Sequence, residues 1–276
     1  MSTPFFPPAD EPREAPASLD LSVPHSARVW NYWLGGKDNY AADRAAGDDV
    51  LKRLPDIADG ARAERAFLVR VIHHLVREAG IRQFLDIGTG LPTMNNTHEV
   101  AQELAPESRV VYVDNDPLVM VHARALLTSS PEGATNYIEA DLREPEAILE
   151  AARQTLDFSR PVGLMLLGVV NHLVDTEQSY AVVRRLVEEL APGSHLVLTH
   201  STAEIHGEPM LEVMREMNER GGTPIIARTR KEIEGYFAGT ELLEPGVVSC
   251  SRWRPEATAV GNPPEVYLFG GVGRVA

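Results

Sequence analysis

Apolar and polar positions alternate along the chain in a way that predicts an α/β fold. Between residues 81 and 202, short apolar runs of strand length are separated by longer segments in which apolar residues recur every three or four positions. The strands are expected at residues 81–87, 109–116, 136–140, 162–167 and 195–199. Such alternation is typical of a doubly wound, mostly parallel sheet with helices on both faces. Residues 247–253 and 265–271 are expected to end the chain as an antiparallel pair of strands.

Helices are expected between these strands and before the first of them. Their residue ranges are 26–34, 41–54, 62–79, 97–104, 117–128, 145–156, about 182–190, and 207–219. Asn95 or Asn96 is suited to cap the fourth helix, because a short amide side chain can accept hydrogen bonds from the first free N–H groups. Gly80 is suited to end the third helix.

Two segments in the last third of the chain are interpreted as ordinary structural features. Met210, Met214 and Met217 share one side of the expected helix, a stripe that favours core packing over a pocket wall. Residues 228–231 are expected to begin a solvated helix.

The chain divides into three parts by composition. Residues 1–22 are rich in proline and acids and are expected to form a disordered tail. Residues 23–80 are expected to form an N-terminal helical cap or lid, and residues 81–276 the sheet domain. No apolar run approaches the ~18 residues of a membrane span, and the start lacks the basic-then-apolar order of a signal peptide. We therefore expect a cytoplasmic protein.

The stretch at residues 84–93 is the clearest candidate for a ligand site. A buried strand ends at Asp86 and Ile87, and Gly88 and Gly90 then allow a sharp turn and a close approach of the backbone to a ligand. Pro92 occupies the place where a dinucleotide fingerprint has its third glycine. An acid at the strand end and a proline in the turn favour a cofactor with a cationic or amino-acid end over a pyrophosphate.

Charge and cysteine content exclude several classes of partner. The formal net charge is -14 and the isoelectric point is about 5.1, which disfavours nucleic acid and anionic membranes as partners. The single cysteine, Cys250, excludes an internal disulfide and a multi-cysteine metal site, and it is expected to be buried. No metal site and no particular oligomeric state are indicated.

Three acids follow the first three strands of the expected sheet. Asp86, Asp114 and Asp141 should converge, because ligands of doubly wound sheets bind at the carboxyl ends of the strands. Asp114 can accept hydrogen bonds from both hydroxyls of a ribose, and Asp141 from an exocyclic amine such as that of adenine. Asp86 can organise the glycine turn and meet an ammonium group. A cofactor that carries all of these groups and a positive centre is S-adenosylmethionine.

The ends of the fourth and fifth strands carry candidates for acid–base chemistry. Asn171 and His172 follow the fourth strand, and His200 and Ser201 follow the fifth. His172 is the first candidate for a general base and His200 the second, since imidazole titrates near neutral pH. The alternative is that either histidine only caps a loop or lines the pocket.

Residues 25–40 combine aromatic, amide and charged side chains beside a glycine pair. One interpretation is that Trp30, Trp33 and Tyr40 anchor a helical cap on the sheet domain. The other is a lid that closes the cofactor site or shapes the acceptor pocket through a set of polar side chains, namely Tyr32, Lys37, Asn39 and Tyr40.

The chain from about residue 22 to residue 276 resembles a known family. Residues 81–202 resemble class I S-adenosylmethionine-dependent methyltransferases in their acid–glycine motif and the acids of strands two and three. More specifically, residues 25–40, 86–93 and 96–101 resemble an actinobacterial group of S-adenosyl methyltransferases formerly described as a domain of unknown function. The resemblance implies a seven-stranded Rossmann-like sheet and S-adenosylmethionine as cofactor.

The resemblance also implies a role for individual positions. The methionine part of the cofactor is expected to contact Asp86, Gly88, Thr89 and Gly90, and the sulfonium is expected to face Gly168. The ribose is expected to contact Asp114 and Asn115, and the adenine is expected to contact Asp141 and Leu142. We therefore expect a methyltransferase that acts on a small-molecule acceptor by in-line transfer. Two alternatives remain open: a module that binds S-adenosylmethionine or its demethylated product without catalysis, and a nicotinamide (NAD-dependent) dehydrogenase, against which Asp86 and Pro92 argue.

Overall fold

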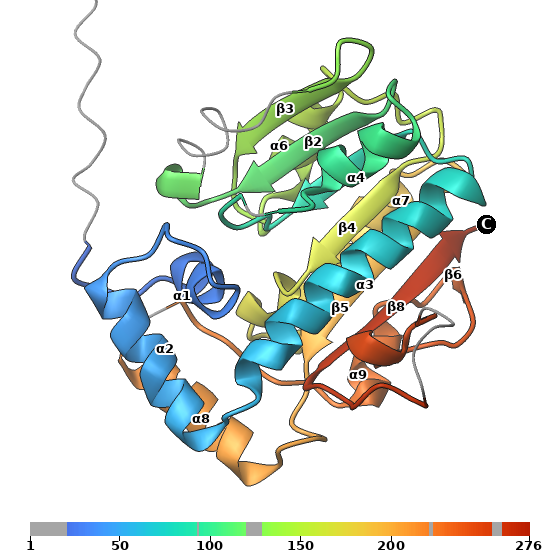
Figure 1. Ribbon diagram of the computed structural model, residues 1–276. Coiled ribbons are helices and arrows are strands. Elements are labelled where there is room, and N and C mark those ends of the chain that lie inside the picture. The colour runs from blue at the N-terminus through green and yellow to red at the C-terminus, as the bar shows by residue number, and fades with distance from the viewer. Residues whose placement is uncertain (1–20, 93, 120–128, 221–222, 256–260) are drawn as a thin grey trace, which may run out of the picture.

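A single mixed sheet organises the protein. The computed structural model describes residues 21–92, 94–119, 129–220, 223–255 and 261–276 (Figure 1). Within these residues the sheet has eight strands in the order β3-β2-β1-β4-β5-β8-β6, and β7 pairs with β8 outside this path. The strands are β1 (Gln83–Ile87), β2 (Arg109–Asp114), β3 (Ala134–Glu139), β4 (Gly163–Leu167), β5 (His195–Ser201), β6 (Thr240–Leu242), β7 (Val248–Ser249) and β8 (Leu268–Val275).

Strands β1 to β5 are parallel, and β8 runs antiparallel to β5, β6 and β7. The doubly wound, mostly parallel sheet predicted from the sequence is confirmed. The antiparallel pairing of the last two expected strands is also confirmed, although β7 is much shorter than residues 247–253. It ends there because the chain turns into a short 3₁₀ helix, η2 (Cys250–Arg252). Strand β6 is an addition that the sequence pattern does not indicate.

Helices cover both faces of the sheet. They are α1 (Ser26–Trp33), α2 (Ala41–Arg53), α3 (Ile57–Arg77), α4 (Thr97–Leu104), α6 (Pro145–Ala152), α7 (Thr176–Glu188), α8 (Glu208–Glu219) and α9 (Arg230–Gly235). The helix expected over residues 117–128 lies largely outside the described residues. None of the helices in the described ranges is both long and apolar enough to cross a membrane.

Successive residues of each central strand belong to two different cores, because side chains alternate across a strand. The core beneath α3 and α4 receives Phe84, Val110, Met165 and Val197. The core beneath α6 and α7 receives Leu85, Val111, Leu164 and Leu198. Burial on both faces explains why these strands read as unbroken apolar runs in the sequence.

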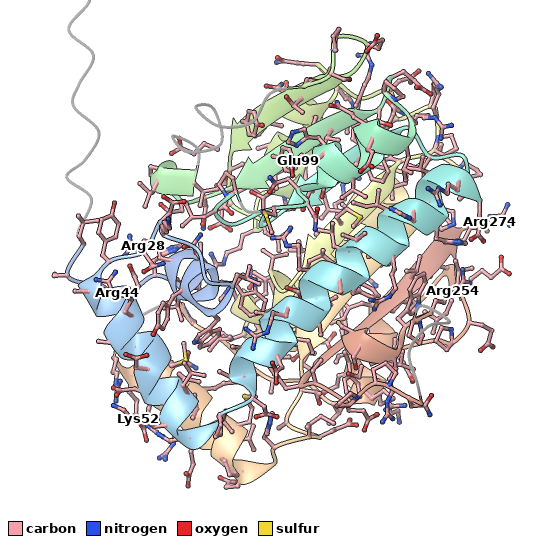
Figure 2. All side chains as sticks on the ribbon, viewed as in Figure 1. Arg28, Arg44, Lys52, Glu99, Arg254 and Arg274 are labelled. Atoms are coloured by element: carbon pink, nitrogen blue, oxygen red, sulfur yellow. The ribbon has the colours of Figure 1, made fainter. Side chains whose placement is uncertain are left out.

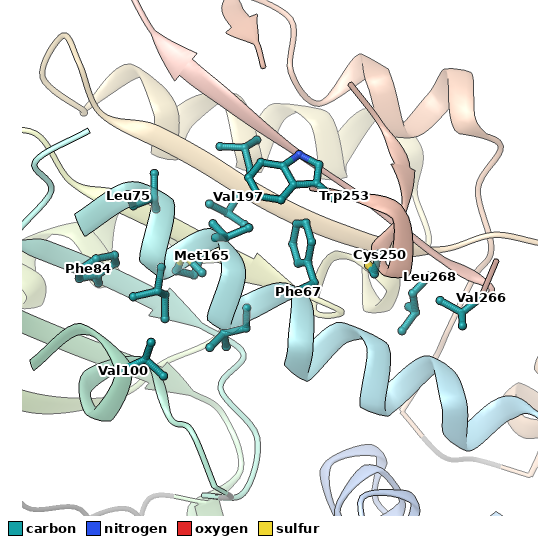
Figure 3. Packing of buried hydrophobic residues seen from close by; sticks show 14 of the residues in the cluster. Phe67, Leu75, Phe84, Val100, Met165, Val197, Cys250, Trp253, Val266 and Leu268 are labelled. Carbon is teal, nitrogen blue, oxygen red and sulfur yellow. The ribbon is translucent and has the colours of Figure 1, made fainter. Parts of the chain in front are cut away.

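The first core is closed by aromatic packing between α3 and the C-terminal region (Figure 3). The rings of Phe67 and Trp253 meet edge to face, with centroids 5.5 Å apart and an interplanar angle of 80°. Cys250 is fully buried close to them, as predicted. This contact joins the helix that precedes the sheet to the segment that closes it.

Helix α3 begins five residues earlier than the sequence pattern predicts. Ile57 is buried and extends the apolar face by more than one turn. Gly60, an unfavourable residue inside a helix, is present because the Tyr267 ring packs against it. A Cβ at Gly60 would lie 2.2 Å from Cε1 of that ring.

The segment before α3 is held together by a buried ion pair. Asp43 of α2 is fully buried and accepts a hydrogen bond of 3.0 Å from Nε of Arg28 on α1. Figure 2 labels Arg28, beside α1 and the start of α2. The Asp43 carboxylate also accepts hydrogen bonds from the backbone N–H groups of His25 and Tyr40, at 2.9 and 2.8 Å. One carboxylate therefore fixes the start of α1, the start of α2 and the angle between them.

The expectation of a solvated helix start at residues 228–231 is wrong for its first member. Arg228 is 2% exposed and donates to the carbonyl of Leu173 at 2.7 Å. Charged residues read as surface by default, and here the backbone carbonyls of a distant loop satisfy the guanidinium instead.

We expect Asp43→Asn to destabilise the protein by about 3–5 kcal/mol, because it leaves the Arg28 guanidinium buried without a counter-charge. Urea unfolding followed by tryptophan fluorescence measures this. The control is Asp59→Asn, whose ion pair with Arg62 is exposed and should cost less than about 1 kcal/mol. Equal effects of the two substitutions would contradict the role given to Asp43.

Candidate active site

A cavity of about 250 Å³ lies at the carboxyl ends of the parallel strands. Residues at the ends of β1 to β5 form its floor, and residues of α1, α3 and α8 form its walls. The expected cofactor residues all line it: Asp86, Gly88, Thr89, Gly90, Asp114, Asn115, Asp141, Leu142 and Gly168. His172 lines it as well. His200, Tyr32, Lys37, Asn39 and Tyr40 are not among the lining residues.

The turn between β1 and α4 requires glycine for two different reasons. Gly88 and Gly90 adopt φ values of +76° and +64°, which residues with a Cβ rarely adopt. A Cβ at Gly88 would also lie 2.3 Å from Cγ2 of Val169, so the loop after β4 packs directly against the turn. Helix α4 then starts at the cap Asn96, in a reciprocal capping box with Glu99.

Asp86 is buried at the end of β1. Its Oδ2 accepts a hydrogen bond of 2.6 Å from the Thr97 hydroxyl, which is provided by the first turn of α4. Burial raises the pKa of Asp86 to about 6, although the Thr97 hydrogen bond and the nearby charge of Arg65 oppose the shift. A cationic group that entered the cavity would favour the ionised form.

Asp114 joins the end of β2 to the glycine turn. Its Oδ2 accepts from the Gly90 amide and its Oδ1 from the Asp116 amide, both at 2.9 Å. Burial raises the pKa of Asp114. Each carboxylate oxygen retains a lone pair, so the group can still accept hydrogen bonds from a ligand.

Asp141, after β3, is the most solvated of the three acids. Its Oδ2 pairs with the guanidinium of Arg143 at 2.9 Å, and its Oδ1 accepts from the Arg143 amide at 2.8 Å. Asn115 lies close enough to donate weakly to the same carboxylate, at 3.4 Å. The three acids thus line one cavity but differ in how far their charge is already balanced.

Helix α3 contributes two charged residues to the cavity that the sequence interpretation missed. Glu64 is 7% exposed and accepts a short hydrogen bond from the Thr199 hydroxyl. Burial raises the pKa of Glu64 to about 7. The Thr199 hydroxyl in turn accepts from the Gly168 amide at 2.8 Å, so a hydrogen-bonded chain runs from β4 through β5 to α3.

Arg65, the next residue of α3, also lines the cavity. Burial lowers the pKa of the Arg65 guanidinium, whereas the nearby carboxyl groups of Glu64 and Asp86 act to raise it. Glu64 falls on the apolar face of α3, four residues before Leu68 and seven after Ile57. An acid at that position of an amphipathic helix is the signal that could have identified it.

The two candidate bases have different environments. Nδ1 of His172 donates to the carbonyl of Pro224 at 2.7 Å, so the neutral ring has its acceptor lone pair on Nε2. Burial lowers the pKa of His172, and the neutral form is therefore favoured at pH 7. His200 is fully buried. Its Nδ1 donates to the Ser201 carbonyl and its Nε2 accepts from Arg228, so neither nitrogen is available to a ligand.

The four polar residues of the lid hypothesis lie elsewhere. Tyr32 donates to Asp48 on α2 at 2.6 Å, Lys37 is exposed, and Tyr40 precedes α2. Asn39 donates to the side chain of Asn31 and the carbonyl of Gly36. Other residues of the same segment line the cavity instead, namely His25, Ser26, Ala27, Val29, Trp30, Asn31 and Trp33.

The lining of the cavity also has an apolar part. Met210, Met214 and Met217 of α8 line it, so the stripe that favoured core packing is also a pocket wall. Met210 and Met214 are also buried, so these two side chains both pack in the core and line the cavity. Leu68 of α3 and Trp30 of α1 belong to the same apolar lining.

The charges of the cavity fit a cofactor that carries positive groups. Four carboxyl groups line it, from Glu64, Asp86, Asp114 and Asp141, against two guanidinium groups, from Arg65 and Arg143. S-adenosylmethionine carries a sulfonium, an ammonium and a carboxylate, and its single net positive charge would offset part of this excess of acid. No group of three or more His, Cys, Asp or Glu side chains in the described parts of the chain is arranged to hold a metal ion.

Comparison with known proteins gives one family. The family model described as S-adenosyl methyltransferase matches residues 12–276. A DUF574 family protein from Streptomyces avermitilis MA-4680 is 45% identical, with a TM-score of 0.88 over 93% of this chain and 99% of that one. A protein from Thermobifida fusca YX, provisionally assigned as a methyltransferase, is 42% identical, with a TM-score of 0.85 over 93% and 96%. No curated protein matched the sequence.

Because the pKa of Glu64 is raised in the folded protein, the free energy of unfolding should depend on pH through this residue. A carboxyl whose pKa is about 7 in the folded protein and 4.5 in the reference state stabilises the fold fully below pH 4.5, and this contribution is lost as the pH rises through 7. Glu64→Gln should therefore be more stable than the ligand-free wild type at pH 8, by at most about 3 kcal/mol. The gain should vanish near pH 4.5.

Chemical unfolding at pH 4.5, 6 and 8 measures this difference. Glu188→Gln, on the exposed side of α7, is the control for the substitution itself. A gain that does not change with pH would contradict the assignment.

Proposed function

We propose that this chain, which belongs to the S-adenosyl methyltransferase family and is an S-adenosylmethionine-dependent methyltransferase, transfers the methyl group to a small-molecule acceptor. One observation carries the proposal. A single cavity combines two parts, a lining of strand-end acids and a lining of apolar side chains from α1, α3 and α8. The first part is suited to the cofactor, and the second to an acceptor with an apolar body.

The order of the strands suggests how the cofactor is held. Asp141 and Leu142, which follow β3, would contact the adenine. Asp114 and Asn115, at the end of β2, would contact the ribose. The methionine part would lie along the glycine turn after β1, against Asp86, Gly88, Thr89 and Gly90. Gly168, at the end of β4, would then face the sulfonium. The excess of carboxyl groups in the cavity supports this arrangement.

His172 is the candidate general base. When bound, S-adenosylmethionine supplies a methyl carbon that is activated by the neighbouring sulfonium. The chain then has to position the acceptor, exclude water and remove one proton. The hydrogen bond from Nδ1 to Pro224 leaves Nε2 of His172 as the acceptor, and burial favours the neutral ring. His200, whose two nitrogens are already hydrogen-bonded, is proposed to support the loop.

We propose that residues 23–80 close one side of the site. The support is that α1 and α3 place His25, Trp30, Asn31 and Glu64 on the cavity wall. The polar residues expected to do this, Tyr32 among them, would act indirectly by fixing α1 against α2.

Asp114→Asn tests the cofactor placement. Replacing the carboxylate removes charge-assisted hydrogen bonds to the ribose, so S-adenosylmethionine should bind roughly 10- to 100-fold more weakly by calorimetry. Asp141→Asn should have a smaller effect, because Asp141 is already paired with Arg143. NAD should not bind. Wild-type affinity in Asp114→Asn, or binding of NAD, would argue against the placement.

His172→Asn tests the base. Removal of a general base typically costs 10²- to 10⁴-fold in rate, and turnover on an accepted substrate should fall by this order while cofactor affinity stays within about threefold. His206→Asn serves as the control, since His206 pairs with Asp56 and does not line the cavity. Unchanged turnover in His172→Asn would remove His172 as the base.

A further inference from the structure

Glu64 is a buried acid of the cavity to which the proposed cofactor placement gives no task. It comes from α3, outside the glycine motif and the strand ends. Its Oε1 lies 3.4 Å from the point where a Cβ on Gly168 would be, and its Oε2 lies 3.8 Å from that point. Gly168 has no side chain, so this carboxyl group lies directly over the backbone at the end of β4.

The strand order defines where this carboxyl lies relative to the cofactor. From β3 to β2 to β1, the ends of the strands carry Asp141, Asp114 and Asp86. The next strands in the sheet are β4 and β5, and Glu64 is hydrogen-bonded over their ends, through Thr199 to the Gly168 amide. In the proposed placement Gly168 at the end of β4 faces the sulfonium, and Glu64, which lies over Gly168, would then lie beside the sulfur.

The carboxyl group is held in a fixed position. It is mounted on a long helix whose neighbouring turns, at Phe67, Leu68 and Val71, are buried in the core. The Thr199 hydroxyl donates to Oε1 and is itself oriented by the Gly168 amide. Among the described residues no ion pair to Glu64 is present, so its charge is available to a ligand in the cavity.

We propose that the Glu64 carboxylate faces the sulfonium of the bound cofactor and makes the site prefer S-adenosylmethionine to S-adenosylhomocysteine. This inference rests on the cofactor placement proposed above. The two ligands share the adenine, the ribose, the carboxylate and the ammonium, and they differ in the methyl group and the charge on sulfur. A buried carboxylate beside that sulfur distinguishes them through charge, which acts strongly in a site of low dielectric.

The protonation of Glu64 is consistent with this role. Burial raises its pKa to about 7, so a nearby cation favours proton loss and a neutral ligand does not. The charged and titratable groups that face it are Arg65 on the same helix, Asp86 at the end of β1, Tyr267 before β8 and Cys250 in η2. These groups are present with both ligands, and their contributions largely cancel in the comparison.

The role has a consequence for turnover. After transfer the sulfur is neutral, and Glu64 can take up a proton from solvent because nothing holds it ionised. The site then loses its electrostatic attraction for the product while its contacts to adenine and ribose stay the same. Glu64 would in this way favour exchange of S-adenosylhomocysteine for a new cofactor.

The test is calorimetry of both ligands on the full chain, wild type and Glu64→Gln, at pH 8. For each protein we compare the Kd for S-adenosylhomocysteine with the Kd for S-adenosylmethionine. This ratio should be at least about tenfold larger in the wild type than in Glu64→Gln, because the substitution removes one close charge pair. Affinity for S-adenosylhomocysteine should change by less than about threefold. Glu188→Gln should leave both affinities unchanged.

Proton release gives a second measurement that a purely structural role would not alter. Titrations at pH 6.5 in buffers of different ionisation enthalpy should show that the wild type releases more protons with S-adenosylmethionine than with S-adenosylhomocysteine. Glu64→Gln should remove this difference.

Two outcomes overturn the inference: an equal loss of affinity for both ligands in Glu64→Gln, or an unchanged preference. Failure of the cofactor placement itself is recognised separately, because Asp114→Asn would then leave the affinity for both ligands intact.

Discussion

The hydrogen bond from the Gly90 amide to the Asp114 carboxylate is the constraint on which the site depends. It joins the turn after β1 to the end of β2, so the two strands present one surface to a ligand. The turn can approach Asp114 only because Gly88 and Gly90 adopt positive φ values, and Val169 fills the space that a Cβ on Gly88 would need. Three adjacent strands are thereby fixed relative to one another by contacts around two glycines.

Much of the fold and of the strand-end site is readable from the sequence. The apolar runs of the parallel strands are long enough to identify, and parallel strands necessarily bring their carboxyl ends to one edge. This is why Asp86, Asp114 and Asp141 could be placed on one cavity without a structure. The bounds of α4 were predicted to the residue, because its cap Asn96 is a local signal, whereas α3 begins five and α7 six residues earlier than the apolar pattern indicates.

Residues whose role depends on tertiary contact could not be read in the same way. Glu64 lies in a helix that precedes the sheet, and only the folded chain shows that Thr199 and Gly168 lie next to it. Arg228 looks solvated in the sequence because its partners are carbonyls of a loop more than fifty residues away. The sequence position of His200, just after a strand, makes it a plausible base. Only the structure shows that both of its ring nitrogens are hydrogen-bonded to other residues of the protein.

The cavity is lined by two kinds of element, a loop that Arg228 fixes in place and a helix, α8, that lies outside the sheet. By holding the carbonyls of Val170 and Leu173, this side chain ties the loop that carries His172 to the segment between α8 and α9. Helix α8 itself contributes methionines to the cavity and no residue to the sheet. Substitutions on α8 can therefore reshape the space proposed for the acceptor while the strand ends keep their geometry. Such a division would allow one scaffold to diverge in the molecules it modifies without rebuilding the part proposed to bind the methyl donor.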